Sequence, residues 1–289
     1  MGSAIAPMFT SERAGTVATV GPVLALDPGA GLLVVVAATL YTGGVRRLAR
    51  RGRRWRRARS AAFVAGLVVV VAATQTGLAG AEAQRFSLHV VQHLLLGMVA
   101  PALFALSAPV TLALQASSRP AQTVLLGVLD HPVVAVLTHP ATAWALFGGS
   151  LVALYFSPLL ELSMDNEVVH LAVHLQFLTV GGLFCWTAIG VDPLRRRLPH
   201  GARLLFVLLA VPVHAIVGLA LLGATEILAV GAYGSGPAAL ADQRVGAGLL
   251  WATGDLFGVI LAGVVLAQWM NHEERVAQRH DRLTLAPPR

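Results

Sequence analysis

Two pairs of histidines, each spaced four residues apart, are the residues of this chain best suited to chemistry. His89 and His93 form one HxxxH pattern, and His170 and His174 form a second. On an α-helix, residues four apart lie on one face with Cβ atoms about 6 Å apart, so two imidazoles can close on one metal ion or on a shared partner. A single pair is weak evidence. Two pairs, each close to the start of an apolar segment, favour a common site.

The composition excludes a water-soluble enzyme and indicates that membrane helices must position these histidines. Of the 289 residues, 56% are hydrophobic and 12% are charged, whereas a soluble domain takes about a quarter of its residues from the charged types. The mean hydropathy is +0.72. We therefore expect a multi-pass membrane protein, in contact with the lipid bilayer.

The absence of lysine and the presence of a single cysteine exclude several kinds of active site. All 21 basic residues are Arg, and without Lys the chain can form neither a retinal or pyridoxal Schiff base nor a phosphate-loop NTPase site. Cys185 is the single cysteine, which excludes an internal disulfide and a thiolate cluster. Any metal would have to rest on His, Met or carboxylate ligands.

Seven apolar stretches are long enough to cross a hydrocarbon core of about 30 Å, which takes about 20 helical residues. They lie near residues 29–45, 61–80, 87–106, 140–158, 167–190, 203–222 and 245–270. The predicted fold is therefore all-α, a polytopic seven-helix bundle over 29–270 with an external segment 1–28 and a cytoplasmic tail 271–289. Residues 1–27 lack the pattern of a cleaved secretory signal, so we expect the first span to be retained.

The placement of arginine predicts the orientation of the bundle. Residues 46–59 hold nine Arg, and positive charge in short loops stays cytoplasmic, so the N-terminus is expected outside and the C-terminus in the cytoplasm. With seven spans, the Arg cluster at 195–197 also falls inside. An eighth span at 120–138 would place that cluster outside, so residues 120–138 are expected to form an interfacial or re-entrant helix on the cytoplasmic side. The nine-Arg run is interpreted as a topology determinant beside anionic lipid, and no nucleic-acid partner is expected.

Ionisable side chains inside a span are costly and tend to face a partner or a cavity. By helical rise, the four paired histidines lie roughly 3 to 11 Å below the external surface, and a further His and Asp lie roughly 12 to 15 Å below it. The candidate metal ligands are therefore His89, His93, His170, His174, His214 and Asp255.

The other soft or titratable residues are weaker candidates. Met98, five residues after His93, is expected to face away from the imidazoles and to pack in the core. Met164 lies in an external loop from which it could reach a metal, although such a residue is more often incidental, and Cys185 is interpreted as a small buried hydrophobe. The remaining histidines are expected to be interfacial or solvated on the cytoplasmic side: His131, His139, His200, His272 and His280.

Three motifs together resemble the CtaG family of caa-type cytochrome c oxidase assembly factors. The first runs from His89-Val-Val-Gln-His93 through Leu-Leu-Leu-Gly-Met-Val-Ala-Pro101 to Ala108-Pro109. The second runs from His170-Leu-Ala-Val-His174 to Gly182-Leu-Phe-Cys-Trp186, where the family tends to have an aromatic residue at Cys185. The third contains Asp242-Gln243-Arg-Val-Gly246, Trp251 and Gly254-Asp255. The likeness covers about residues 30–270.

The resemblance implies a membrane factor, not an enzyme, that acts with membrane-bound oxidase subunits and supports copper insertion. Imidazole also suits Zn, Fe and Ni, so ligand type alone leaves the ion open. Two alternatives remain: a b-type cytochrome with one haem held between histidines of two spans, and a metal transporter. A third interpretation is that the histidines only hold helices together through hydrogen bonds.

Overall fold

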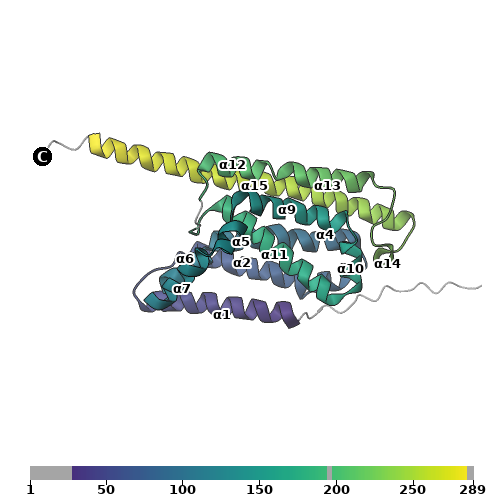
Figure 1. Cartoon of the computed structure of the whole chain (residues 1–289), viewed down its shortest axis with the longest axis horizontal. Helices are drawn as coiled ribbons and strands as arrows, with labels where there is room; N and C mark the ends of the chain where they lie inside the picture. The colour runs from purple at the N-terminus through teal and green to yellow at the C-terminus, as the bar shows by residue number, and fades with distance from the viewer. Residues whose placement is uncertain (1–27, 194–196, 285–289) are drawn as a thin grey trace, which may run out of the picture.

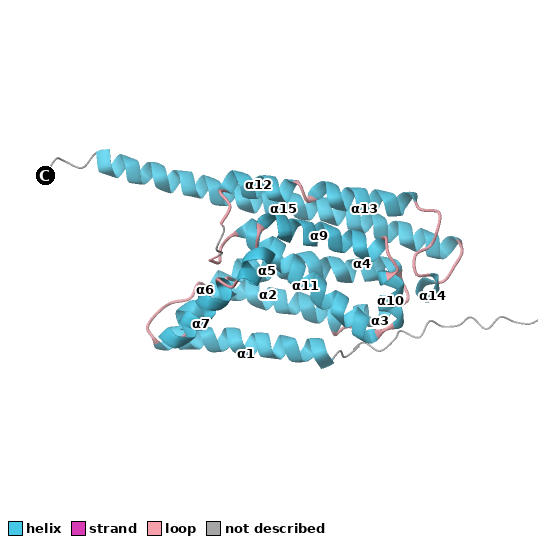
Figure 2. Cartoon of the chain, viewed as in Figure 1, coloured by secondary structure: helices cyan, strands magenta, loops and turns pink. Residues whose placement is uncertain are grey.

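Helices form every regular element in the part of the chain that the structure describes, residues 28–193 and 197–284 of a computed structural model (Figures 1 and 2). In the first half the helices are α1 (Pro28–Arg50), α2 (Arg57–Thr74), α3 (Gly77–Ala81), α4 (Phe86–Leu94), the π-helix η1 (Leu95–Val99), α5 (Ala100–Ser107), α6 (Pro109–Ala116), α7 (Arg119–Leu129) and α8 (Pro132–Leu137). They continue as α9 (Pro140–Tyr155), α10 (Leu159–Asp165), α11 (Glu167–Ile189), α12 (His200–Leu208), α13 (Val211–Gly223), α14 (Val230–Tyr233) and α15 (Pro237–Thr284). The expected external segment at 1–27, Arg195 and Arg196 of the predicted cytoplasmic cluster, and residues 285–289 of the expected tail lie outside the described residues.

Six stretches of the described chain are long and apolar enough to cross a membrane. They are Gly29–Arg50, Arg57–Ala81, Phe86–Ala116, Glu167–Ile189, His200–Gly223 and Pro237–Asp281. A seventh span results if α9 and α10, which meet at an angle of 70°, are counted as one bent unit. This is the architecture of a multi-pass helical membrane protein. The orientation of its termini stays a prediction.

The boundaries follow local backbone chemistry. Ala108, with a positive φ of 54°, ends α5, and Pro109 begins α6; proline is favoured there because the first helical N–H needs no partner. Residues 120–138 form the short helices α7 and α8, neither of which is among the candidate spans. His131 and His139, expected as interfacial or solvated groups, cap α8 and α9 by accepting hydrogen bonds from backbone N–H groups.

The last helix is longer than the expected span at 245–270. It continues without a break from Pro237 to Thr284 and so includes most of the expected tail. Residues 271–284 contain neither Gly nor Pro, the two residues that most disfavour a helix interior. In Figure 1 this end of α15 extends well beyond the rest of the bundle.

The interior of the bundle surrounds α11 and the first part of α15. The first packs against α5, η1 and α9, and the second packs against α13, α12 and α4. Large side chains such as Phe86, Phe184 and Leu154 are almost fully buried between them. Exposed apolar side chains line the outside, as a lipid-facing surface requires: Leu32, Leu40, Val68, Ile216 and Val259 are among them.

Two glycines let the helices that carry the histidine pairs come close together. A Cβ added at Gly181 of α11 would collide with the carbonyl oxygen of Gly97 in η1, and one added at Gly97 would lie 2.9 Å from the Phe177 ring. Small residues at helix contacts are the usual way for membrane helices to approach closely. The contact lies one to two turns beyond His93 and His174, so it sets the distance between the two pairs.

Candidate metal centre

The structure brings the two HxxxH pairs together on α4 and α11. Ring centroids lie 4.2 Å apart within each pair, His89 to His93 and His170 to His174. Between the helices, His93 lies 5.5 Å from His174 and His89 lies 5.9 Å from His170, again between centroids. The four imidazoles therefore form one cluster, called here the imidazole cluster.

The cluster is buried except at its outer edge. His89 is fully buried, His93 and His174 are 3% and 8% exposed, and the His170 side chain is 19% exposed. Asn166 begins α11 by accepting hydrogen bonds from two backbone N–H groups one turn before His170. The helix start thus fixes the outer imidazole, and the pitch of the helix places His174 one turn deeper.

Glu82 is a part of this cluster that sequence reasoning missed. Its Oε2 lies 2.7 Å from Nδ1 of His89, and its Oε1 lies 3.4 Å from Nε2 of His170. Glu82 ends α3, and the connection to α4 leaves the helical conformation at Arg85, which has an extended backbone. Because the chain is not one continuous helix here, helical spacing does not predict the contact. The sequence signal for Glu82 was a carboxylate seven residues before an HxxxH pair.

Gln92 defines the protonation of His174. Its amide nitrogen donates to the Ala73 carbonyl oxygen at 2.9 Å, so its oxygen is the atom that lies 3.1 Å from Nε2 of His174. An oxygen can only accept, and Nε2 must therefore carry the proton. In the neutral ring the lone pair is then on Nδ1 of His174.

Several buried nitrogens of the cluster have no hydrogen-bond partner. They are Nε2 of His89 and both ring nitrogens of His93. Buried polar atoms are nearly always paired, so unpaired ones call for an explanation such as a bound ion or water. Among the described residues no group of three or more His, Cys, Asp or Glu is already arranged around a common metal position. Imidazole is a ligand type that several transition metals favour, so the residues present are chemically suited to such a metal.

A small cavity connects the cluster with His214. About 20 Å³ in volume, it is lined by His93, Met98, Tyr155 and His214 among others. Met98 is buried in the core as predicted. It lies in η1, where π-helical hydrogen bonds join residues five apart, and it lines this cavity together with His93.

The two deeper candidates are placed differently. Nδ1 of His214 lies 3.3 Å from the Ala210 carbonyl oxygen, and its ring packs against Gly254, where an added Cβ would lie 2.5 Å away. Asp255 is next in the chain, and its Oδ1 is buried without a hydrogen-bond partner. Asp255 does not line the cavity that His93 and His214 share.

Met164 is connected to the cluster indirectly. The Tyr233 hydroxyl of α14 lies 3.4 Å from the Met164 sulfur, and the Tyr233 ring centroid lies 6.2 Å from that of His89. Burial and the neighbouring Glu82 carboxylate raise the pKa of Tyr233, so the phenol stays protonated and can donate. Cys185 is fully buried and free, as expected for a small hydrophobe.

The fold and the site define a class: a multi-pass helical membrane protein with a buried cluster of imidazoles near one end of its bundle. Comparison with known proteins then identifies the family. The chain belongs to the cytochrome c oxidase caa3 assembly factor family, CtaG, whose family model matches residues 39–272. The resemblance seen in the three motifs is confirmed.

Curated relatives come from mycobacteria. Uncharacterized proteins of Mycobacterium bovis and Mycobacterium tuberculosis are each 34% identical over 279 residues, 92% of this chain and 42% of their own length. One from Mycobacterium leprae is 34% identical over 87% of this chain and 40% of its own length. The chain thus spans about two fifths of the curated relatives it matches. No solved structure matches it.

Proposed function

We propose that this protein is a non-catalytic membrane factor that binds copper through its two HxxxH pairs and supports insertion of the ion into cytochrome c oxidase. The observation that carries the proposal is the set of buried, unpartnered nitrogens of His89 and His93 within a cluster of four imidazoles. Membership of the oxidase assembly family supports the second half. Copper is here the cargo.

The neighbours of the cluster prepare it to receive a cation. Hydrogen-bonded to Glu82 through Nδ1, His89 presents the lone pair of Nε2, and His174, hydrogen-bonded to Gln92, presents that of Nδ1. Carboxylates and amides in such positions fix the ring tautomer and raise the basicity of the ligand. His93 contributes either nitrogen. The Glu82 carboxylate adds a negative charge that offsets the charge of the incoming ion.

The exposed edge supports an entry route. His170, the one partly exposed imidazole of the cluster, also contacts Glu82, so an ion can first bind at the edge and then move inward to His93 and His174. Met98 and His214 line the small cavity together with His93. They supply a thioether and a further imidazole as deeper ligands. Asp255 remains a candidate beyond them.

The orientation of the bundle in the membrane bears on which partner receives the copper. If the Arg-rich end lies in the cytoplasm, the imidazole cluster lies near the external surface of the bacterial plasma membrane. Copper that reaches an oxidase from outside crosses only the outer part of the bilayer. We therefore propose transfer to membrane-bound oxidase subunits, sideways within the membrane.

The test is a His89→Ala/His93→Ala variant expressed in place of the wild type under copper limitation. We expect lower copper content and activity of the oxidase, with normal accumulation of the variant in the membrane. The matched control is His280→Ala, which removes an imidazole from the exposed end of α15. Full oxidase activity in the double variant would overturn the proposal, and failure of the variant to accumulate would favour a purely structural role for the imidazoles.

Two measurements separate the alternatives. A Soret band in the purified protein would identify a b-type haem held by these histidines instead. Metal uptake into sealed vesicles that contain the purified protein alone would identify a transporter, which needs a continuous path of ligands across the membrane.

A further inference from the structure

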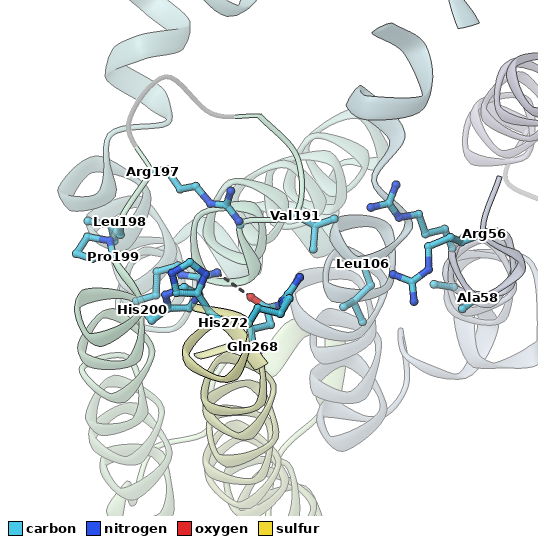
Figure 3. Close-up of a pocket in the computed structure, with 15 residues that line it drawn as sticks. Arg56, Ala58, Leu106, Val191, Arg197, Leu198, Pro199, His200, Gln268 and His272 are labelled. Atoms are coloured by element: carbon cyan, nitrogen blue, oxygen red, sulfur yellow. Dashed lines mark hydrogen bonds between the residues drawn. The ribbon is translucent and has the colours of Figure 1, made fainter. Parts of the chain in front are cut away.

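An open groove of about 1060 Å³ lies at the other end of the bundle from the imidazole cluster. The two features lie at opposite ends of α11, with His170 near its start and Gly190 directly after its last residue. Figure 3 shows residues from α2, α5, α12, α15 and the connection before α12 around this groove. Segments far apart in the sequence therefore build one site.

The groove is strongly basic. No Asp or Glu is among its lining residues. Two acids that are sequence neighbours of lining residues already accept hydrogen bonds: Asp192 from groups at the start of α6, and Glu273 from the Trp269 indole. The arginines that line the groove are Arg56, Arg59, Arg197, Arg203 and Arg275. His200 and His272 lie beside them, with ring centroids 5.1 Å apart.

Arg203 distinguishes this groove from a solvated basic surface. Only 1% exposed, it donates from Nη1 to the Ile189 carbonyl oxygen at 2.8 Å and to Oε1 of Gln268 at 2.9 Å. Its Nε is buried without a partner. A buried guanidinium without an anionic partner is costly, so a ligand that supplies negative charge would compensate the cost.

Gly190 provides the space for this guanidinium. It has a positive φ of 58°, and an added Cβ would lie 2.8 Å from Nη1 of Arg203. The end of α11 thus has both the backbone conformation and the small residue that let Arg203 reach the groove. Leu106, Val191 and Leu198 give part of the lining an apolar character.

We propose that this groove binds a phosphate-bearing anion, with Arg203 as its fixed contact and the exposed Arg197 and Arg275 as its outer contacts. Guanidinium forks match phosphate oxygens in charge and geometry. The phosphate belongs either to the headgroup of an anionic phospholipid, whose chains the apolar lining would accept, or to a free phosphate compound.

The experiment uses the full chain, purified in detergent and reconstituted in nanodiscs. Three probes are compared: anionic phosphatidylglycerol, zwitterionic phosphatidylcholine, whose choline cation neutralises the phosphate, and inorganic phosphate. Binding is followed by native mass spectrometry for the lipids and by isothermal titration for phosphate. The groove variant is Arg197→Gln/Arg275→Gln, both exposed in the structure, and the matched control is Arg53→Gln/Arg279→Gln, two exposed arginines outside the groove lining.

We expect the wild type and the control to bind phosphatidylglycerol or inorganic phosphate alike, and the groove variant to bind the same probe at least about tenfold more weakly. Retention of phosphatidylglycerol without binding of inorganic phosphate assigns the site to lipid; the reverse assigns it to a free phosphate compound. An Arg203→Lys variant, which keeps the charge and loses the fork, should bind more weakly than the wild type. Equal binding by the groove variant and its control, or no preference for phosphatidylglycerol over phosphatidylcholine with no phosphate binding, would overturn the proposal.

Discussion

The two ends of the bundle treat polar side chains in opposite ways. At one end, three of the four imidazoles are buried, and Glu82 and Gln92 fix the rings through contacts of 2.7 and 3.1 Å. At the other end, arginines of several segments line an open groove of about 1060 Å³. One end keeps the lone pairs of its imidazoles buried, and the other presents positive charge in an open groove.

A metal ion and an anion require different environments. A metal ligand must be a neutral imidazole with a free lone pair, and burial favours the neutral ring. An anion site requires groups that stay charged, which Arg does in proteins. In this chain the two environments are separated along the length of α11.

The largest expected effect is in surface labelling, because an introduced cysteine is either modified in intact cells or not modified at all. In intact cells an impermeant thiol reagent should modify an Asp165→Cys variant and not an Arg53→Cys variant, because the His end is predicted to face outside. Both positions are exposed, whereas the native Cys185 is fully buried. Labelling is measured by gel shift with and without permeabilisation. The reverse pattern would place the imidazole cluster at the cytoplasmic face.

Gly181→Ala should disturb the His end through packing alone. The added methyl group meets the Gly97 carbonyl oxygen, and overpacking of this kind costs about 1 to 3 kcal/mol. The expected result is a lower midpoint of thermal unfolding in detergent and weaker metal binding. Gly182→Ala is the matched control, since its Cβ would make an ordinary contact at 3.9 Å. Equal behaviour of the two variants would show that the close approach of the helices does not set the site.

Glu82→Gln should weaken metal binding without unfolding the protein. The amide keeps the size of the side chain but loses the charge and one acceptor, and loss of such a supporting group typically costs about 10- to 100-fold in metal affinity. Affinity is measured by competition with a chromogenic copper chelator. Glu161→Gln, at an exposed position on α10, serves as control. Unchanged affinity in Glu82→Gln would remove the carboxylate from the site.

Met98→Leu should have the smallest effect. The substitution roughly conserves volume, so stability should change by less than about 1.5 kcal/mol. The metal content of the purified protein should stay the same, because all four imidazoles remain. A clear loss of metal would add the Met98 thioether to the ligand set and extend the site toward His214 through their shared cavity.

The features that the sequence could predict, the membrane spans and the layer of four histidines, depend on regular helices. Hydropathy located the spans, and four-residue spacing with equal distances from helix starts placed His89, His93, His170 and His174 in one layer. Both inferences use only the geometry of an ideal helix. The structure agrees on the six or seven candidate spans and on the contact between the two pairs.

What sequence could not predict lies where the helix is irregular or where many segments meet. Glu82 reaches His89 through a turn of no fixed pitch, and Met98, which lies in the π-helix η1, lines a cavity together with His93. The groove around Arg203 needs the relative positions of several helix ends. In each case the missing information is three-dimensional packing, which residue spacing does not contain.

Metal analysis of the detergent-purified protein tests most directly whether the imidazole cluster binds copper. The wild type, grown with copper, is compared with a variant in which His89, His93, His170 and His174 are all replaced by Ala, and both are checked for helical content. We expect copper in the wild type and only background in a folded quadruple variant. Equal copper in both proteins, or a wild type that holds none after reconstitution with copper, would show that the imidazole cluster does not bind copper.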